Sequence, residues 1–195
     1  MSKYTPEKLF QLLHCCDYGY ISNGKRKTEN LGNFEDYLTL SPKELITYKI
    51  GTCWDFTTYE YLFFRKYMIN IPVKCFYIEA EDNSTHTWLV FYKNNLVNIF
   101  EYSWYDLRGI HTFNTETEML NFYTIRFLHT VHPFNDTFAI YTYIPPKQYH
   151  LDPDQFMYYV TTTGQFINDT NSYHTIIERY NAIYKGGNNN AKSIN

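Results

Sequence analysis

The 195-residue chain lacks any apolar run close to the roughly 20 residues that a membrane-spanning helix needs. Its N-terminus carries Glu7 and Lys8 where a secretory signal peptide would be apolar. Lys and Arg number 17 against 20 Asp and Glu, and the net charge of −3 gives no electrostatic attraction to nucleic acid or to an anionic membrane. We therefore expect a cytoplasmic protein, in its own cell or inside a host cell, with neither nucleic acid nor membrane as a partner.

Motifs for bound nucleotides and metals are also missing. The sequence holds no phosphate-binding glycine loop, no dinucleotide-binding glycine pattern and no calcium-binding loop. The adjacent Cys15 and Cys16 do not have the spacing of a metal site, and no third ligand accompanies His129 and His132. The sequence therefore indicates neither a metal nor an organic cofactor.

Cysteine is sparse, which argues against the disulfide framework of a small secreted protein. The four cysteines are Cys15, Cys16, Cys53 and Cys75. We expect all of them to be thiols, so packing must supply the core, in which 21 tyrosines and 15 phenylalanines dominate. A chain of this length can bury such a core in one domain, which we place at 1–185. The polar residues 186–195 are expected to form a disordered tail.

Capping and turn signals divide the chain into helices and strands. Thr5-Pro6 and Ser41-Pro42 each place a capping hydroxyl before a proline, which predicts a helix start. Helices are expected at 6–16, 42–48, 53–68, 115–128 and 173–184, and strands at 18–22, 73–79, 86–92, 96–102 and 138–144. The strands between 73 and 102 should pair antiparallel as a meander, which gives an α+β fold class.

Cys53 lies in the first turn of the helix expected at 53–68. There, the free backbone N–H groups and the helix dipole favour a thiolate, and the same N–H groups can bind an oxyanion. Gly51 allows a sharp turn just before it and leaves room for a substrate backbone. An isolated cysteine is more often a small buried apolar residue, so Cys53 becomes a candidate nucleophile only together with residues downstream.

A histidine and a carboxylate follow in two later strands, His86 in Thr-His-Thr-Trp and Glu101 in Phe-Glu-Tyr-Ser-Trp. A base that takes the thiol proton and an acid that orients the base would complete a triad with Cys53. Each residue also has a plainer interpretation, His86 as a partly buried structural histidine and Glu101 as an ordinary strand acid. Asp106, five residues after Glu101, is the competing carboxylate.

The register of the hairpin decides which side chain adjoins the histidine. A turn at 93–95 would place His86 opposite Tyr102, with Glu101 or Ser103 beside it. A shift of one residue exchanges these two neighbours, and the sequence leaves both open.

Together, the segments Gly-Thr-Cys-Trp, Ile-Pro-Val-Lys-Cys-Phe, His-Thr-Trp-Leu-Val-Phe and Phe-Glu-Tyr-Ser-Trp resemble the transglutaminase-like branch of the papain-like superfamily, over about residues 41–125. They are particularly similar to small bacterial and phage members with a G-x-C-W-D core and an F-E-x-S-W acid strand. The resemblance implies a nucleophile helix packed on an antiparallel β-sheet, with Cys53 as nucleophile, His86 as base and Glu101 as orienting acid. Glu101 departs from most of the wider family, which has aspartate followed by proline and threonine.

The expected activity is cysteine-dependent acyl transfer from an amide of a protein or peptide, including a protein of a host cell. Peptide or isopeptide hydrolysis, glutamine deamidation and transamidation all proceed through the same thioester. The alternatives are a catalytically silent binding module of this fold and an effector that binds a host protein. Tyr48 could donate to an oxyanion, and Trp54 is expected in the core rather than on the substrate groove. Specificity is expected from the loops at 24–32 and 108–115 and from the segment after Pro146.

Overall fold

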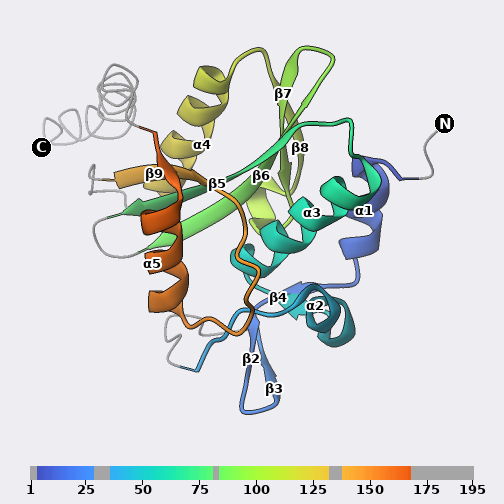
Figure 1. Ribbon diagram of the computed structural model, residues 1–195, viewed down its shortest axis with the longest axis vertical. Helices are drawn as coiled ribbons and strands as arrows, with labels where there is room; N and C mark the ends of the chain where they lie inside the picture. Colours follow the sequence, from blue (N-terminus) through green and yellow to red (C-terminus); the bar gives the residue numbers. More distant parts are fainter. Residues whose placement is uncertain (1–3, 29–35, 81–83, 132–137, 168–195) are drawn as a thin grey trace, which may run out of the picture.

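The computed structural model describes residues 4–28, 36–80, 84–131 and 138–167 (Figure 1). Within these ranges the helices are α1 (Pro6–Leu13), α2 (Pro42–Tyr48), α3 (Cys53–Tyr67), α4 (Glu116–Val131) and α5 (Pro153–Thr163), with a 3-10 helix η1 (Tyr105–Leu107). The strands are β1 (Asp17–Tyr18), β2 (Tyr20–Ser22), β3 (Lys25–Lys27), β4 (Ile50–Gly51), β5 (Val73–Ala80), β6 (Thr85–Lys93), β7 (Leu96–Glu101), β8 (Gly109–Phe113), β9 (Phe138–Tyr143) and β10 (Gln165–Phe166). The protein is therefore a mixed α+β structure, as predicted.

A six-stranded sheet in the order β10-β9-β5-β6-β7-β8 forms the centre of the fold. Every neighbouring pair in this sheet is antiparallel, and β5, β6 and β7 form the predicted meander. β8 extends the sheet beyond β7, while β9 and β10 extend it beyond β5.

The two faces of the sheet bury different helices because side chains alternate along each strand. Cys75, Tyr77 and Leu89 share a core with residues of α1, α3 and α5. Phe76 and Trp88 share the opposite core with residues of α4. Figure 1 shows α3 running across the sheet, which carries its N-terminus towards the region where β6 begins and β7 ends.

The predicted helix starts are confirmed by their caps. The Thr5 hydroxyl accepts the Lys8 N–H at 3.2 Å, and Ser41 forms a reciprocal capping box with Glu44. The first helix ends at Leu13 rather than at residue 16. The chain leaves the helix there because Asp17 and Tyr18 pair with the strand that precedes α3.

The strand predicted at 18–22 is two strands that separate at Gly19. Gly19 has φ +149°, and a Cβ there would lie 2.0 Å from the Lys27 carbonyl oxygen, so only glycine fits. β1 pairs in parallel with β4, whereas β2 pairs with β3 through the predicted turn at Asn23 and Gly24.

Three segments that were expected to be loops contain regular structure, the first of which is β3 within the loop expected at 24–32. Residues 109–113 form the edge strand β8, and α5 occupies 153–163 after a proline and a reciprocal capping box at its start. The helix predicted at 173–184, the tail at 186–195 and His132 lie outside the described residues. In the described part of the chain, no helix combines the length and the apolar character needed to cross a membrane.

Candidate active site

Cys53 is the first residue of α3, and the backbone around it is tightly constrained. Thr52 is the N-cap, and its N–H donates to the Asp55 carboxylate at 2.8 Å. A Cβ on Gly51 would lie 2.4 Å from Leu45 Cδ1 and 3.0 Å from Asp55 Cβ. A side chain at position 51 would therefore crowd Leu45 of α2 and Asp55 of α3, and the space for a substrate backbone stays a prediction.

Asp55 anchors a neighbouring segment to the start of α3. Its buried carboxylate accepts the Leu40 N–H at 2.7 Å and the Tyr37 hydroxyl at 3.1 Å, in addition to the Thr52 N–H. Burial raises the pKa of Asp55 to about 6, although these hydrogen bonds act to lower it. Asp55 thus fixes the frame in which Cys53 is held.

The hairpin between β6 and β7 turns through two residues rather than three. Asn94 and Asn95 both have positive φ, 55° and 61°, which suits a two-residue turn between twisted strands. Lys93 pairs with Leu96, and the register is shifted by one residue from the predicted one. The pairing of β6 with β7 ends at Leu89 and Phe100, beyond which the two strands separate.

This register places His86 and Glu101 on the same face of the sheet, where their side chains meet. His86 Nε2 lies 3.0 Å from Glu101 Oε2. Asp106, the competing carboxylate, lies exposed in η1. Of the two candidate acids, the structure therefore brings Glu101 to the histidine.

Glu101 is buried with a full set of hydrogen-bond donors. Its Oε1 accepts the Ser103 hydroxyl and the Trp104 N–H, each at 2.8 Å. Its Oε2 accepts the hydroxyl of Tyr123 from α4. The Tyr123 ring also stacks near His86, with centroids 5.8 Å apart, and Trp104 meets the imidazole edge-on at 5.3 Å.

The charges of this pair stabilise each other. Burial alone would lower the pKa of His86, but the charge of Glu101 and hydrogen bonds with Cys53 and Glu101 outweigh it and raise the pKa to about 10. Burial would raise the pKa of Glu101, but His86 and the hydrogen bonds from Tyr123 and Trp104 lower it overall. At neutral pH the pair is therefore imidazolium and carboxylate.

The histidine also contacts the cysteine. Nε2 faces Glu101, and Cys53 is among the groups that raise the pKa of His86. Next to His86, the Thr87 hydroxyl donates to the Cys53 carbonyl oxygen at 2.9 Å, which fixes α3 against β6. The structure thus brings Cys53, His86 and Glu101 together in that order.

Two residues of this site were missed in the sequence. Tyr18 lies beside the start of α3, because β1 pairs with β4, and Tyr123 hydrogen-bonds to Glu101. Tyr18 lies in a two-residue strand and Tyr123 in an apolar stretch of helix, so neither has a local signal of its role. Tyr48, the tyrosine considered from the sequence, lies exposed at the end of α2.

Trp54 belongs to the core, as expected, and is stacked on Phe156 with ring centroids 4.4 Å apart. Its neighbour in sequence, Cys53, belongs to the same apolar cluster. The cysteine thus lies at the border between this core and the polar cluster of His86 and Glu101.

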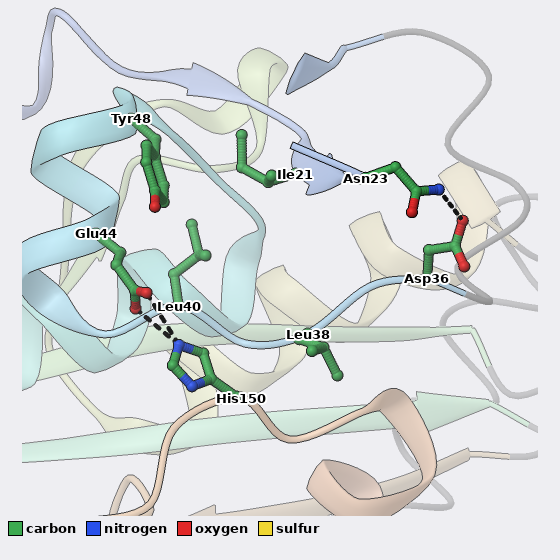
Figure 2. Close-up of a pocket in the computed structure, with 8 residues that line it drawn as sticks. All are labelled: Ile21, Asn23, Asp36, Leu38, Leu40, Glu44, Tyr48 and His150. Carbon is green, nitrogen blue, oxygen red and sulfur yellow. Dashed lines mark hydrogen bonds and ion pairs between the residues drawn. The ribbon is translucent and has the colours of Figure 1, made fainter. Parts of the chain in front are cut away.

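A separate cavity of about 480 Å³ lies between β2, α2, the segment 36–40 and His150. Figure 2 shows Glu44 and His150 meeting at one side of it and Asn23 and Asp36 at another. Tyr48 lines this cavity, while Cys53, His86 and Glu101 do not. The cavity is therefore distinct from the candidate active site.

All four cysteines are free thiols, and their environments differ. Cys53 and Cys16 are equally buried, with 4% and 3% of their surface exposed. Burial raises the pKa of Cys16 to about 12 and that of Cys75 well above its usual range. Across the described residues, no group of three or more His, Cys, Asp or Glu side chains could hold a metal ion.

Comparisons with protein-family models, with curated proteins and with solved structures found no match to this chain.

Proposed function

We propose that the protein is a cysteine-dependent acyl-transfer enzyme that acts on an amide of a protein or peptide, with Cys53 as nucleophile. The observation that carries this proposal is the pairing of His86 with Glu101 close to the N-terminus of α3, where Thr87, the residue after His86, is hydrogen-bonded to the Cys53 carbonyl oxygen. This arrangement supplies a sulfur, a proton carrier and an acid that orients the carrier. The resemblance of the surrounding segments to the transglutaminase-like branch of the papain-like superfamily supports the same assignment.

In the proposed reaction Cys53 Sγ attacks the amide carbonyl carbon, and a tetrahedral intermediate forms with its negative charge on the oxygen. The backbone N–H groups at the start of α3 are the donors nearest to that oxygen. The carbon–nitrogen bond then breaks, and His86 gives its proton to the leaving amine. A thioester on Cys53 remains.

The raised pKa of His86 determines where the proton is before the reaction starts. An imidazolium at neutral pH already holds the proton that the leaving amine needs, and it favours the thiolate beside it. Glu101 holds this imidazolium through its buried carboxylate. The role of His86 as acid is therefore better supported than a role as a neutral base in the resting enzyme.

A second nucleophile resolves the thioester. His86, which is neutral after giving up its proton, takes a proton from water or an amine as that nucleophile attacks the thioester carbon. The carbon–sulfur bond breaks and Cys53 is regenerated. We favour water, and therefore hydrolysis or deamidation, because water needs no second binding site.

Alkylation by iodoacetamide at pH 6, read by peptide mapping, tests the activation of Cys53. Cys16 is the matched control, because it is equally buried but its pKa is raised to about 12. We expect Cys53 to react at least ~100-fold faster than Cys16, since only Cys53 faces an imidazolium. The variant His86→Ala should lose this preference, whereas His150→Ala, which removes an exposed histidine paired with Glu44, should keep it.

Equal and slow labelling of Cys53 and Cys16 would contradict the proposal. Acylation by p-nitrophenyl acetate, measured by intact-protein mass spectrometry, distinguishes the proposed enzyme from a catalytically silent binding module. A Cys53 that alkylates selectively but forms no acetyl adduct would indicate a binding module of the same fold.

A further inference from the structure

The cavity beside α2 has one wall that the fold holds firmly in place. This wall is the segment 36–40, of which the Thr39 N–H donates to the Leu151 carbonyl oxygen at 2.9 Å. The Leu40 N–H donates to the buried Asp55 carboxylate at 2.7 Å. The cavity is therefore preformed, and its volume of about 480 Å³ lies within the roughly 300–1,000 Å³ of ligand pockets.

Apolar side chains form the middle of this cavity. They are Ile21, Leu38, Leu40 and Tyr48. In Figure 2, Leu38 and Leu40 lie between the pair of Glu44 with His150 and the pair of Asn23 with Asp36. Leu38 and Tyr48 expose 47% and 43% of their surface, and this apolar surface is available to a ligand. The cavity thus offers contacts to an aliphatic chain between two polar sides.

The two carboxylates of the cavity have different partners. Both oxygens of Glu44 lie 3.0 Å from Nε2 of His150. Asp36 accepts hydrogen bonds from uncharged groups, the Ser22 hydroxyl at 3.0 Å and the Asn23 amide at 3.4 Å, and both reach Oδ2. In the described part of the chain no donor reaches Oδ1 of Asp36, and no lysine or arginine lines the cavity. Asp36 is therefore the carboxylate that lacks a cationic partner among these residues.

This combination of charge and apolar surface selects one class of ligand. An anion would meet Asp36 and Glu44 without a lysine or arginine to bind it. A purely apolar ligand would desolvate Asp36 without giving it a partner. An ammonium or guanidinium group on an aliphatic stem pairs with the carboxylate and covers the apolar middle. Lysine and arginine side chains have this chemistry.

We propose that this cavity binds a lysine or arginine side chain of a protein or peptide, with the cationic group at Asp36 and the stem against Leu38 and Leu40. Binding needs no reaction at Cys53, so the inference goes beyond the proposed function and does not depend on it. The segment after Pro146, from which specificity was expected, contributes His150 to this cavity.

Titration of isotope-labelled protein with capped single amino acids, followed by NMR chemical shifts, tests the proposal directly. The probes are the N-acetyl N-methylamides of lysine, arginine and norleucine, and norleucine has an apolar stem like that of lysine without the charge. We expect saturable shifts at Leu38 and Leu40 with the capped lysine and the capped arginine. Capped norleucine should bind at least about tenfold more weakly, because it makes no hydrogen bond to the carboxylate.

Two variants locate the parts of the ligand. Asp36→Asn removes the charge but keeps an oxygen for the Ser22 hydroxyl, and it should lower the affinity for capped lysine about tenfold. Leu38→Asn should lower it about threefold through lost apolar contact. Asp36 and Leu38 are both exposed, so we expect both variants to fold. Asp106→Asn, which removes an exposed aspartate of η1 outside the cavity, is the matched control and should bind like the wild type.

The proposal is overturned if no probe gives saturable shifts at the cavity, or if capped norleucine binds as tightly as capped lysine. Unchanged affinity in Asp36→Asn would also overturn it, because the cation would then lie elsewhere. Saturation by only one of the two cationic probes would support the proposal and identify the side chain. None of these outcomes bears on Cys53, whose role is tested separately by alkylation and acylation.

Discussion

Two buried glutamates near His86 and Cys53 have opposite environments. Glu101 and Glu60 each expose 1% of their surface. Glu101 accepts hydrogen bonds from Ser103, Trp104 and Tyr123 and faces His86, whereas Oε1 of Glu60 has no hydrogen-bond partner among the described residues. The pKa of Glu101 is lowered, while burial and the charge of Glu101 raise that of Glu60 well above its usual range. Donors, and not depth of burial, decide which of the two carboxyls carries a charge.

The neutral state of Glu60 matters for the site. Glu60 lies seven residues after Cys53 on α3, about 10 Å along the helix. An ionised Glu60 would add a second negative charge near His86 and would disfavour a thiolate at Cys53. A protonated Glu60 leaves Glu101 as the carboxylate that holds the imidazolium.

The largest expected difference between the two glutamates is in their effect on the reactivity of Cys53. Glu101→Gln should lower acylation of Cys53 by p-nitrophenyl acetate about 10²- to 10⁴-fold, because the imidazolium loses its partner. Glu60→Gln should change the rate less than about threefold, since it replaces one neutral group by another. Asp106→Asn serves as the control for loss of a nearby exposed carboxylate and should react like the wild type. A similar loss of acylation rate in Glu60→Gln and Glu101→Gln would show that the two glutamates do not differ in their effect on Cys53.

The next effect is on the pH dependence of stability, and its sign differs between the two residues. The folded pKa of Glu60 is raised, so its contribution to stability is fully present below about pH 4.5 and falls by about 1.4 kcal/mol per unit as the pH rises towards the folded pKa. The folded pKa of Glu101 is lowered, so its contribution is present above about pH 4.5 and is lost as the pH falls. Urea unfolding at pH 5 and pH 8 should show Glu60→Gln gaining free energy of unfolding relative to wild type between these pH values, because only the wild type loses stability as the pH rises.

For Glu101→Gln, the same measurement between pH 7 and pH 3 should show the reverse. Its deficit in free energy of unfolding should shrink as the pH falls, because the wild type then also loses the carboxylate charge. Parallel pH profiles for wild type and Glu60→Gln would mean that Glu60 is ionised in the folded protein.

A smaller effect is expected from one donor of Glu101. Tyr123→Phe removes the hydroxyl that Oε2 accepts but keeps the ring, which stacks on Trp88 with centroids 4.2 Å apart. We expect a loss of about 1.5 kcal/mol in free energy of unfolding, measured in urea at pH 7, because the hydrogen bond is to a charged group. Tyr105→Phe, at an exposed tyrosine, should change nothing. No loss in Tyr123→Phe would mean that the other three contacts are sufficient for Glu101.

Local signals were sufficient for the elements that carry the three candidate residues. Gly51 and Thr52 marked the start of α3, and the alternating segments around His86 and Glu101 marked β6 and β7. The start of α5 had a signal of the same kind as α2, since Asp152 precedes Pro153 and forms a capping box with Gln155. That signal was overlooked. β8 had no local sequence signal, because its residues are mostly half-buried at the edge of the sheet.

Contacts between distant segments were beyond what the sequence could predict. Tyr18 lies beside the start of α3 because a two-residue strand pairs across more than thirty positions, and so short a strand has no periodicity to detect. Tyr123 looked like an ordinary apolar helix residue, and its hydroxyl meets Glu101 only because α4 packs under β7. Which of Glu101 and Ser103 adjoins His86 depended on a register that the backbone angles of Asn94 and Asn95 set.

The hairpin turn at Asn94 and Asn95 makes loop length a determinant of chemistry at the far end of the strands. Substitutions that keep a two-residue turn leave every side chain of β7 on its present face. An insertion or deletion of one residue would turn each side chain of β7 to the other face and move Glu101 away from the imidazole, although the sequence would still contain all three candidate residues. Homologues that keep the pair of His86 and Glu101 should therefore vary freely in the composition of this turn but not in its length.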